Sequence, residues 1–118
     1  MTTATAYALA STAILAILIG QLLFKRVANL IAGKPLQQAL QNPEVIGNLA
    51  VAVLIYGAAT VIWVLALRHL ALSRAYMLMA AGFIFIPICS HFFFSEPLSK
   101  QFFLGASLIA IGIVLTNS

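Results

Sequence analysis

Side chains able to do acid–base, nucleophilic or metal chemistry are sparse in this sequence. Glu44 and Glu96 are its only acids, Cys89 is its only cysteine, and the two histidines, His69 and His91, stand far apart. Catalysis by acid and base needs titratable groups within hydrogen-bond reach, and a metal site needs several ligands at close spacing. No carboxylate pair, Ser-His-Asp set or glycine-rich phosphate loop can be found. The sequence therefore predicts that the protein is not an enzyme and uses no metal or other cofactor.

Four polar residues at the ends of apolar stretches are candidates for binding a solute. Gln21 and Lys25 are four apart, which places them on one face of a helix, and Arg74 and Tyr76 stand together at the start of a later stretch. Polar groups at membrane depth are costly unless they have a partner or line a wet path. At one level of the membrane, Gln21, Lys25, Arg74 and Tyr76 would form a substrate-binding, anion-tolerant entrance. Snorkelling by Lys25, helix–helix bonding by Gln21 and an aromatic belt at Tyr76 are the simpler explanations.

The elements that must position these residues follow from the composition. Of the 118 residues, 64% are hydrophobic and 7% are charged, whereas a soluble domain has about 25% charged residues. Asp, Glu, Lys and Arg are absent from residues 2–24, 45–67, 75–95 and 101–118. Each stretch is close to the roughly 20 residues that cross a bilayer. We expect an all-α membrane protein of one domain, residues 1–118, with four closely packed, antiparallel transmembrane helices near residues 5–25, 44–67, 73–94 and 99–117.

Helix boundaries are marked by caps and prolines. Pro35 is expected to start a short amphipathic helix on the membrane surface, with Leu36 and Leu40 on its apolar face. In Asn42-Pro43-Glu44, an N-cap, a first-turn proline and an acid at the positive end of the helix dipole predict the start of the second span. Ser73 is expected to cap the third span. Pro87 removes one backbone hydrogen bond within that span, which predicts a bend over residues 83–87.

The net charge of +4 does not indicate nucleic-acid binding. The six basic residues stand at the ends of the expected helices, where they meet lipid phosphates. We expect the bilayer itself to be the main partner and no nucleic acid to bind.

Small residues in the last stretch predict association between subunits. Gly105 and Gly112 are seven apart, two turns along one face, with Leu108 and Ile109 between them. Small residues let transmembrane helices approach closely, and four helices are few to enclose a solute path. We expect a homodimer, or a heterodimer with a similar small protein, whose interface contains these four residues. Two inverted subunits would bring Lys25 of one near Arg74 of the other, because within one subunit these residues start on opposite faces of the membrane.

Five short segments in this order resemble a known family. They are GQLLFK at residues 20–25, WVLAL at 63–67, AY at 75–76, EPLS at 96–99 and GASLIAIG at 105–112. Together they resemble the drug/metabolite transporter superfamily, specifically its four-helix members, over nearly the whole chain. No single segment is specific, and the order and spacing carry the resemblance.

Two branches of that superfamily compete. The small multidrug resistance proteins are antiparallel dimers that exchange protons for cations. They rely on a glutamate three residues before the first-helix glycine, and that position is Ile17 here. Their third-helix tryptophan corresponds to Met79. Isoleucine has no titratable group, so the sequence argues against proton-coupled cation export.

The second branch, the small EamA-like flippase subunits for aminoarabinose linked to undecaprenyl phosphate, is more similar. Those have a Gly-Gln pair followed by Lys in the first helix, which Gly20, Gln21 and Lys25 match, whereas Met77 stands where they have proline. The resemblance implies a flippase-like transporter of a polyprenyl-phosphate-linked sugar or similar metabolite, multi-pass in the bacterial inner membrane. A multidrug-type exporter of cationic compounds and a non-transporting assembly partner of another membrane protein remain the alternatives.

Overall fold

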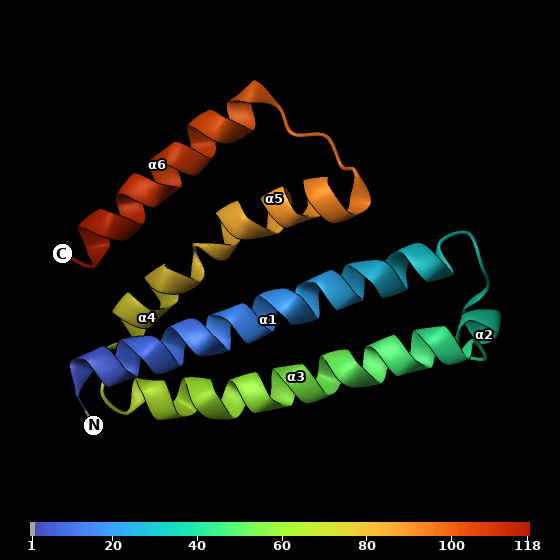
Figure 1. Ribbon diagram of the computed structural model, residues 1–118, viewed down its shortest axis with the longest axis horizontal. Coiled ribbons are helices and arrows are strands. Elements are labelled where there is room, and N and C mark those ends of the chain that lie inside the picture. The colour runs from blue at the N-terminus through green and yellow to red at the C-terminus, as the bar shows by residue number, and fades with distance from the viewer. Residues whose placement is uncertain (1) are drawn as a thin grey trace.

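Helices make up almost all of the computed structural model, which describes residues 2–118 (Figure 1). Three stretches are long and apolar enough to cross a membrane: α1, α3, and α4 together with α5. α6 is a shorter apolar helix of 17 residues. The all-helical membrane architecture is thus confirmed. The bounds are α1 Thr3–Ile31, α2 Leu36–Ala39, α3 Pro43–Leu67, α4 Leu72–Met79, α5 Gly82–Phe94 and α6 Lys100–Thr116.

α1 is longer than the expected span of residues 5–25, which was too short at its second end. Lys25 and Arg26 lie inside the helix, because straight-chain side chains favour helical backbone and can extend away from it. The helix ends only before Gly33, whose φ of 74° is a left-handed conformation that suits glycine. Its 29 residues correspond to about 43 Å, more than the roughly 30 Å of a hydrocarbon core. α1 is therefore long enough for its Lys25 end to reach the membrane interface.

The connection to α3 has the expected form. Pro35 precedes the short helix α2, and Leu36 and Leu40 are both exposed. The Asn42 side chain accepts a hydrogen bond from the backbone N–H of Glu44 at 3.0 Å, and Pro43 opens α3. The N-cap and first-turn proline are confirmed.

The third span is interrupted earlier than expected. Its break begins at Ala80 and Ala81, between α4 and α5, and hydrogen bonds to the third residue back continue to Phe83 and Ile84, at the start of the range 83–87 where a bend is expected. The backbone N–H groups of Ala80 and Ala81 donate three residues back, to Met77 and Leu78, at 3.1 and 3.0 Å. A Cβ added to neighbouring Gly82 would lie 3.0 Å from Leu18 Cδ2 of α1. The break therefore falls where the span packs against α1.

Packing sets the start of α4. The helix begins at Leu72 and has no side-chain cap, so the expected cap at Ser73 was wrong. Leu70 and Ala75, on either side of the start, are buried in one cluster with Ala6 and Ala66. Burial of these two residues fixes the path of the turn without a capping hydroxyl.

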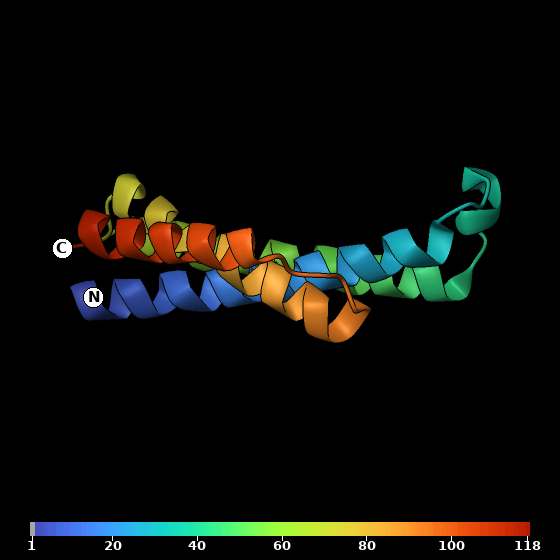
Figure 2. The ribbon, with the colours of Figure 1, turned by 90° about the horizontal axis from the view of Figure 1, so that it is seen from above.

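The helices lie side by side in a row rather than in a closed bundle. Figures 1 and 2 show the order α3, α1, α4 with α5, and then α6, in a layer whose Cα atoms span 49 × 37 × 18 Å. Successive spans alternate in direction, as expected. However, α4 and α5 pack on α1 rather than on α3, so the second and third spans are not neighbours. The long connection after α1 lets α3 pack on one side of α1 and leaves the other side of α1 for the third span.

A small-residue seam holds α1 against α3. The buried residues of the two helices recur every seven positions, the spacing of a left-handed helix pair. Such spacing with small side chains permits close backbone approach in a membrane, where lipid supplies no hydrophobic drive. The seam consists of Ala6, Ala13, Gly20 and Val27 in α1 and Val45, Ala52, Ala59 and Ala66 in α3.

α6 is the least packed helix, and close packing of all four spans was not found. None of its residues is buried. Near its C-terminus, Tyr7 Oη donates to Asn117 Oδ1 at 3.2 Å, which connects that end to α1. α6 therefore forms an open edge of the row.

Ala59→Leu tests the seam. Added bulk between α1 and α3 is expected to lower the free energy of unfolding by about 1–3 kcal/mol. The matched control is Ala58→Leu, at an exposed position one residue earlier, where the same side chain faces outward. Unfolding in mixed detergent micelles measures both variants. Equal stability of the two variants would show that the seam is not a tight contact.

Candidate functional site

Lys25 is joined to Glu96 at the interface end of α1. Its Nζ lies 3.0 Å from Glu96 Oε1, and the two side chains are 44% and 41% exposed. Glu96 belongs to the turn between α5 and α6, so the ion pair connects the first span to the last turn. The sequence offered no reason to include Glu96 in the site. The pairing depends on tertiary structure and leaves no signal in the sequence spacing.

Local backbone geometry holds Glu96 in this place. α5 ends at Phe94, and the next residue, Ser95, reverses the chain with a φ of 54°, in the left-handed region. The N–H of Glu96 donates to the Ser90 carbonyl at 3.4 Å, and His91 Nδ1 lies 2.7 Å from the Glu96 carbonyl oxygen, to which it donates as the Nδ1–H tautomer. His91 therefore fixes the turn that carries the carboxylate.

Gln21 is bonded to Tyr56 of α3. Its Nε2 donates to the Tyr56 hydroxyl. Gly20 makes this possible, because a Cβ at that position would lie 2.5 Å from the Tyr56 ring. The Phe24 ring stacks on Tyr56 with centroids 5.2 Å apart. The first-helix Gly-Gln pair thus forms a seat for Tyr56, a residue that sequence reasoning did not include in the site.

These contacts form one polar strip, defined as Tyr56, Gln21, Lys25 and Glu96. Gln21 and Lys25 are one helical turn apart, about 6 Å along α1. Both are exposed on the surface of the single chain. The strip runs from an uncharged hydrogen-bonding pair to a charged pair. Such a strip can offer amide and hydroxyl groups to a polar ligand and an ammonium to an anion.

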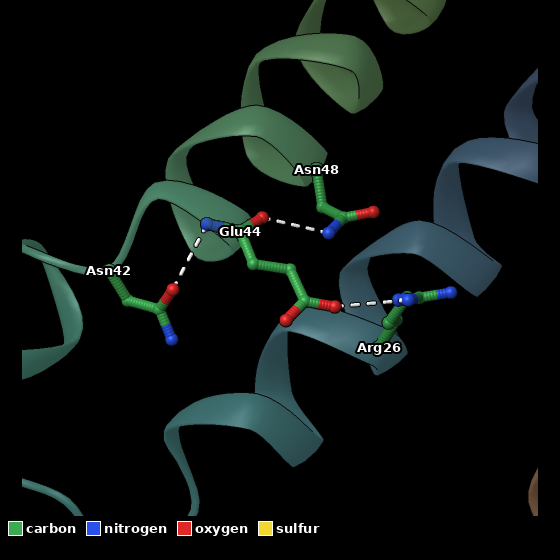
Figure 3. Close-up of polar contacts among 4 residues, drawn as sticks. All are labelled: Arg26, Asn42, Glu44 and Asn48. Carbon is green, nitrogen blue, oxygen red and sulfur yellow. Dashed lines mark hydrogen bonds and ion pairs between the residues drawn. The ribbon is translucent and has the colours of Figure 1, made fainter.

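A second ion pair lies at the same end of the molecule. Arg26 Nη2 lies 3.0 Å from Glu44 Oε1, with the side chains 58% and 50% exposed (Figure 3). Glu44 is also the first-turn residue of α3, where Asn42 accepts its N–H and Asn48 Nδ2 donates to its carbonyl at 2.7 Å. This pair joins α1 to the start of α3. The Glu44 of this pair is the first-turn acid of α3 that the sequence predicts.

Arg74 and Tyr76 lie at the opposite end of the row, so the four candidate residues do not share one level. Ala75 between them is buried in one cluster with Ala10 of α1. Lys25 is 15 residues beyond Ala10, about 22 Å along the helix. The four candidate residues therefore form two pairs, one at each end of the row, and not the single entrance expected from the sequence. The separation within one subunit agrees with the antiparallel arrangement of the spans.

A groove adjoins the second pair. Its volume is about 640 Å³, and it is open and almost wholly apolar. Tyr76, which is 61% exposed, lines it from α4, and Thr116 lines it from the end of α6. The remaining lining residues are Leu72, Ser73 and Met77. Arg74 makes no ion pair within residues 2–118. This end therefore combines an apolar groove with a cation that no acid of the described chain neutralises.

The four residues expected at a subunit interface lie along α6. A Cβ added to Gly105 or Gly112 would meet no atom within 4 Å. Leu108 is 63% exposed, and Ile109 is half-buried. The space at both glycines is open in the single chain.

The chain is similar to bacterial flippase subunits. A sequence profile of the EamA-like transporter family matches residues 1–118. A probable 4-amino-4-deoxy-L-arabinose-phosphoundecaprenol flippase subunit ArnE of Pectobacterium atrosepticum is 33% identical over 97 residues, 82% of this chain and 84% of the relative. The corresponding subunit ArnF of Pseudomonas aeruginosa is 37% identical over 82 residues, 66% of this chain but only 60% of the relative. No solved structure matches the chain.

Gly20→Ala tests the seat of Tyr56. The new methyl group must displace the Tyr56 ring, and overpacking of this kind costs about 1–3 kcal/mol. Gly57→Ala is the matched control, because a Cβ there meets nothing within 4 Å. Both changes gain about 1 kcal/mol of helix propensity, so their difference isolates the clash. Unfolding in detergent should rank Gly20→Ala below Gly57→Ala, and the reverse order would contradict the seat.

Proposed function

Because the chain belongs to the EamA-like transporter family, we propose that it is a flippase subunit for a polyprenyl-phosphate-linked sugar in the bacterial inner membrane. The names of the ArnE and ArnF relatives describe probable subunits of a 4-amino-4-deoxy-L-arabinose-phosphoundecaprenol flippase. We propose further that the chain has four spans, forms a dimer and binds its cargo through the residues described below.

The observation that carries the proposal is the polar strip at the edge of a long apolar helix. A lipid-linked sugar has a phosphate, a polar sugar and a long apolar chain. Lys25, near the interface end of α1, suits the phosphate, and Gln21 and Tyr56 suit sugar hydroxyls. The isoprenoid chain can remain in lipid beside the exposed apolar faces. Each part of the ligand would thus contact a suitable group of the protein or the lipid at its own depth in the membrane.

Arg74 and Tyr76 would serve the same ligand at the opposite membrane face. The adjoining groove is apolar and open, as a polyprenyl chain requires. Arg74 is free of ion pairing in the described chain and can meet a phosphate there. Cations at both ends of the row support transfer of an anionic headgroup between two similar sites.

The runner-up, a multidrug-type exporter of cations, lacks an obvious coupling acid. Ile17 occupies the matching position in α1. The two glutamates stand at helix ends, and each is paired with a cation. A proton-coupled cation site would have to break one of these pairs. An assembly partner without transport of its own is the third candidate, and it would bind another membrane protein but flip nothing.

The unpacked edge of the row supports the fourth span and the dimer. The 17 residues of α6 correspond to about 25 Å, near the lower limit for crossing a bilayer. A span with no buried residue has its packing surface free for a second subunit. Gly105, Leu108, Ile109 and Gly112 are the proposed contact, either with a second copy or with a similar small subunit.

Gly105→Leu and Gly112→Leu are expected to weaken this association by about 1–3 kcal/mol, because bulk is added where helices should touch. Ser107→Leu, at an exposed position of the same helix, is the control. Crosslinking in liposomes, with the chain alone and with its cognate partner, measures the dimer. A parent that is monomeric in both samples would refute the proposed contact, as would two glycine variants that dimerise fully.

Flipping itself can be measured in liposomes with a fluorescent polyprenyl-phosphate sugar and the chain reconstituted with its partner. Lys25→Ala and Arg74→Ala should each slow flipping about tenfold or more, because a hydrogen bond to a charged group contributes about 1.5–3 kcal/mol. Lys34→Ala, which removes an exposed cation from the loop after α1, should leave the rate unchanged.

Two other results would contradict the proposed binding residues or the proposed flippase function. Unchanged flipping in both variants would mean that Lys25 and Arg74 only snorkel. Uptake of quaternary ammonium compounds driven by a pH gradient, and abolished by Glu96→Gln, would identify the multidrug-type exporter.

A further inference from the structure

We infer that Glu96 is a resident counter-ion of the binding site, which the phosphate of an arriving lipid must displace from Lys25. The inference rests on the proposed function and adds a residue to it. Glu96 would thereby set the affinity for anionic headgroups by competing with them for the same ammonium.

The geometry gives Glu96 the place that a phosphate oxygen would take. Its Oε1 lies 3.0 Å from Lys25 Nζ, within the range of a charge-assisted contact. The carboxylate therefore neutralises Lys25 while no anionic ligand is present.

The pair is suited to exchange. Both side chains are nearly half exposed, and exposed ion pairs are weak. The phosphodiester of a polyprenyl-phosphate sugar carries one negative charge and two non-bridging oxygens, as a carboxylate does, so it can replace Glu96 at Lys25.

The turn does not depend on the carboxylate. The backbone of Glu96 is fixed through His91 and Ser90, and Ser99 caps α6 by accepting the N–H of Phe102 at 3.1 Å. The Glu96 side chain can therefore swing away from Lys25 while the turn and the start of α6 keep their hydrogen bonds.

The chain contains its own control. Arg26 and Glu44 form an ion pair with the same 3.0 Å separation at the same end of α1. That pair faces the start of α3 and lies outside the polar strip. Glu44→Gln removes the carboxylate partner of Arg26 at the same end of α1 and leaves the ion pair between Lys25 and Glu96 intact.

The test is the affinity for a short polyprenyl phosphate, measured in nanodiscs of zwitterionic lipid with the chain and its partner. Glu96→Gln should bind about two- to fivefold more tightly than the parent, the gain equivalent to one exposed ion pair. Glu44→Gln should bind as the parent does. In a Lys25→Ala background, Glu96→Gln should not change the affinity, because the ammonium for which Glu96 and the phosphate compete is absent. Polyprenol without phosphate should not distinguish the parent from Glu96→Gln.

A purely structural clamp gives a different pattern. The double variant Lys25→Glu with Glu96→Lys restores an ion pair between α1 and the turn but removes the ammonium from α1. A clamp would retain the parent's affinity in this variant, whereas a resident counter-ion predicts a loss similar to that of Lys25→Ala. Retained affinity, or Glu96→Gln that binds no more tightly than the parent, would overturn the inference.

The failure of this inference is distinguishable from that of the proposed function. If the parent binds polyprenyl phosphate and Glu96→Gln fails to tighten it, only the counter-ion role is lost. If neither the parent nor Glu96→Gln binds polyprenyl phosphate or a polyprenyl-phosphate sugar, the proposed cargo is wrong and the counter-ion role falls with it.

Discussion

The close contact between α1 and α3 is the constraint on which the rest of the structure depends. In lipid there is no hydrophobic force to press helices together, so they approach through small residues. The seven-residue repeat of small side chains supplies this along both helices. The same contact admits the Tyr56 ring at Gly20, which brings the Tyr56 hydroxyl to Gln21. α1 then presents its other side to the third span and its end to the last turn, so every polar contact of the strip involves α1 or a neighbour that it positions.

The membrane architecture was predictable because it follows from local properties of the chain. Charge-free stretches fix the approximate spans, and Asn42 and Pro43 fix the start of α3 through hydrogen bonds a few residues long. The length of α1 was not predictable from its charges, since Lys25 and Arg26 continue a helix as readily as they end one. The break at Ala80 and Ala81 depends on the crossing with α1, which only the folded chain shows.

The candidate site was predicted in part. Gln21 and Lys25 share a face, as their spacing indicates, but their partners Tyr56 and Glu96 come from other spans and follow from no local rule. The α1–α3 seam, in contrast, was present in the sequence as residues seven apart. The glycines of α6 have the same spacing, and in the single chain nothing fills the space before them. The repeat in α1 and α3 is buried within the chain, whereas the repeat in α6 is open and is consistent with contact to a second subunit.

The central claim is that the ammonium of Lys25 meets the phosphate of the cargo. Solid-state NMR of the chain with ¹⁵N-labelled lysine, reconstituted with its partner and a polyprenyl-phosphate sugar in phosphorus-free glycolipid, measures the dipolar coupling between each lysine Nζ and the ³¹P of the cargo. Lys25→Arg assigns the Lys25 signal by its disappearance. The account predicts that phosphorus attenuates the Lys25 signal when the lipid is bound and leaves that of Lys34 unchanged. Bound lipid that attenuates other lysine signals but not that of Lys25 would contradict it.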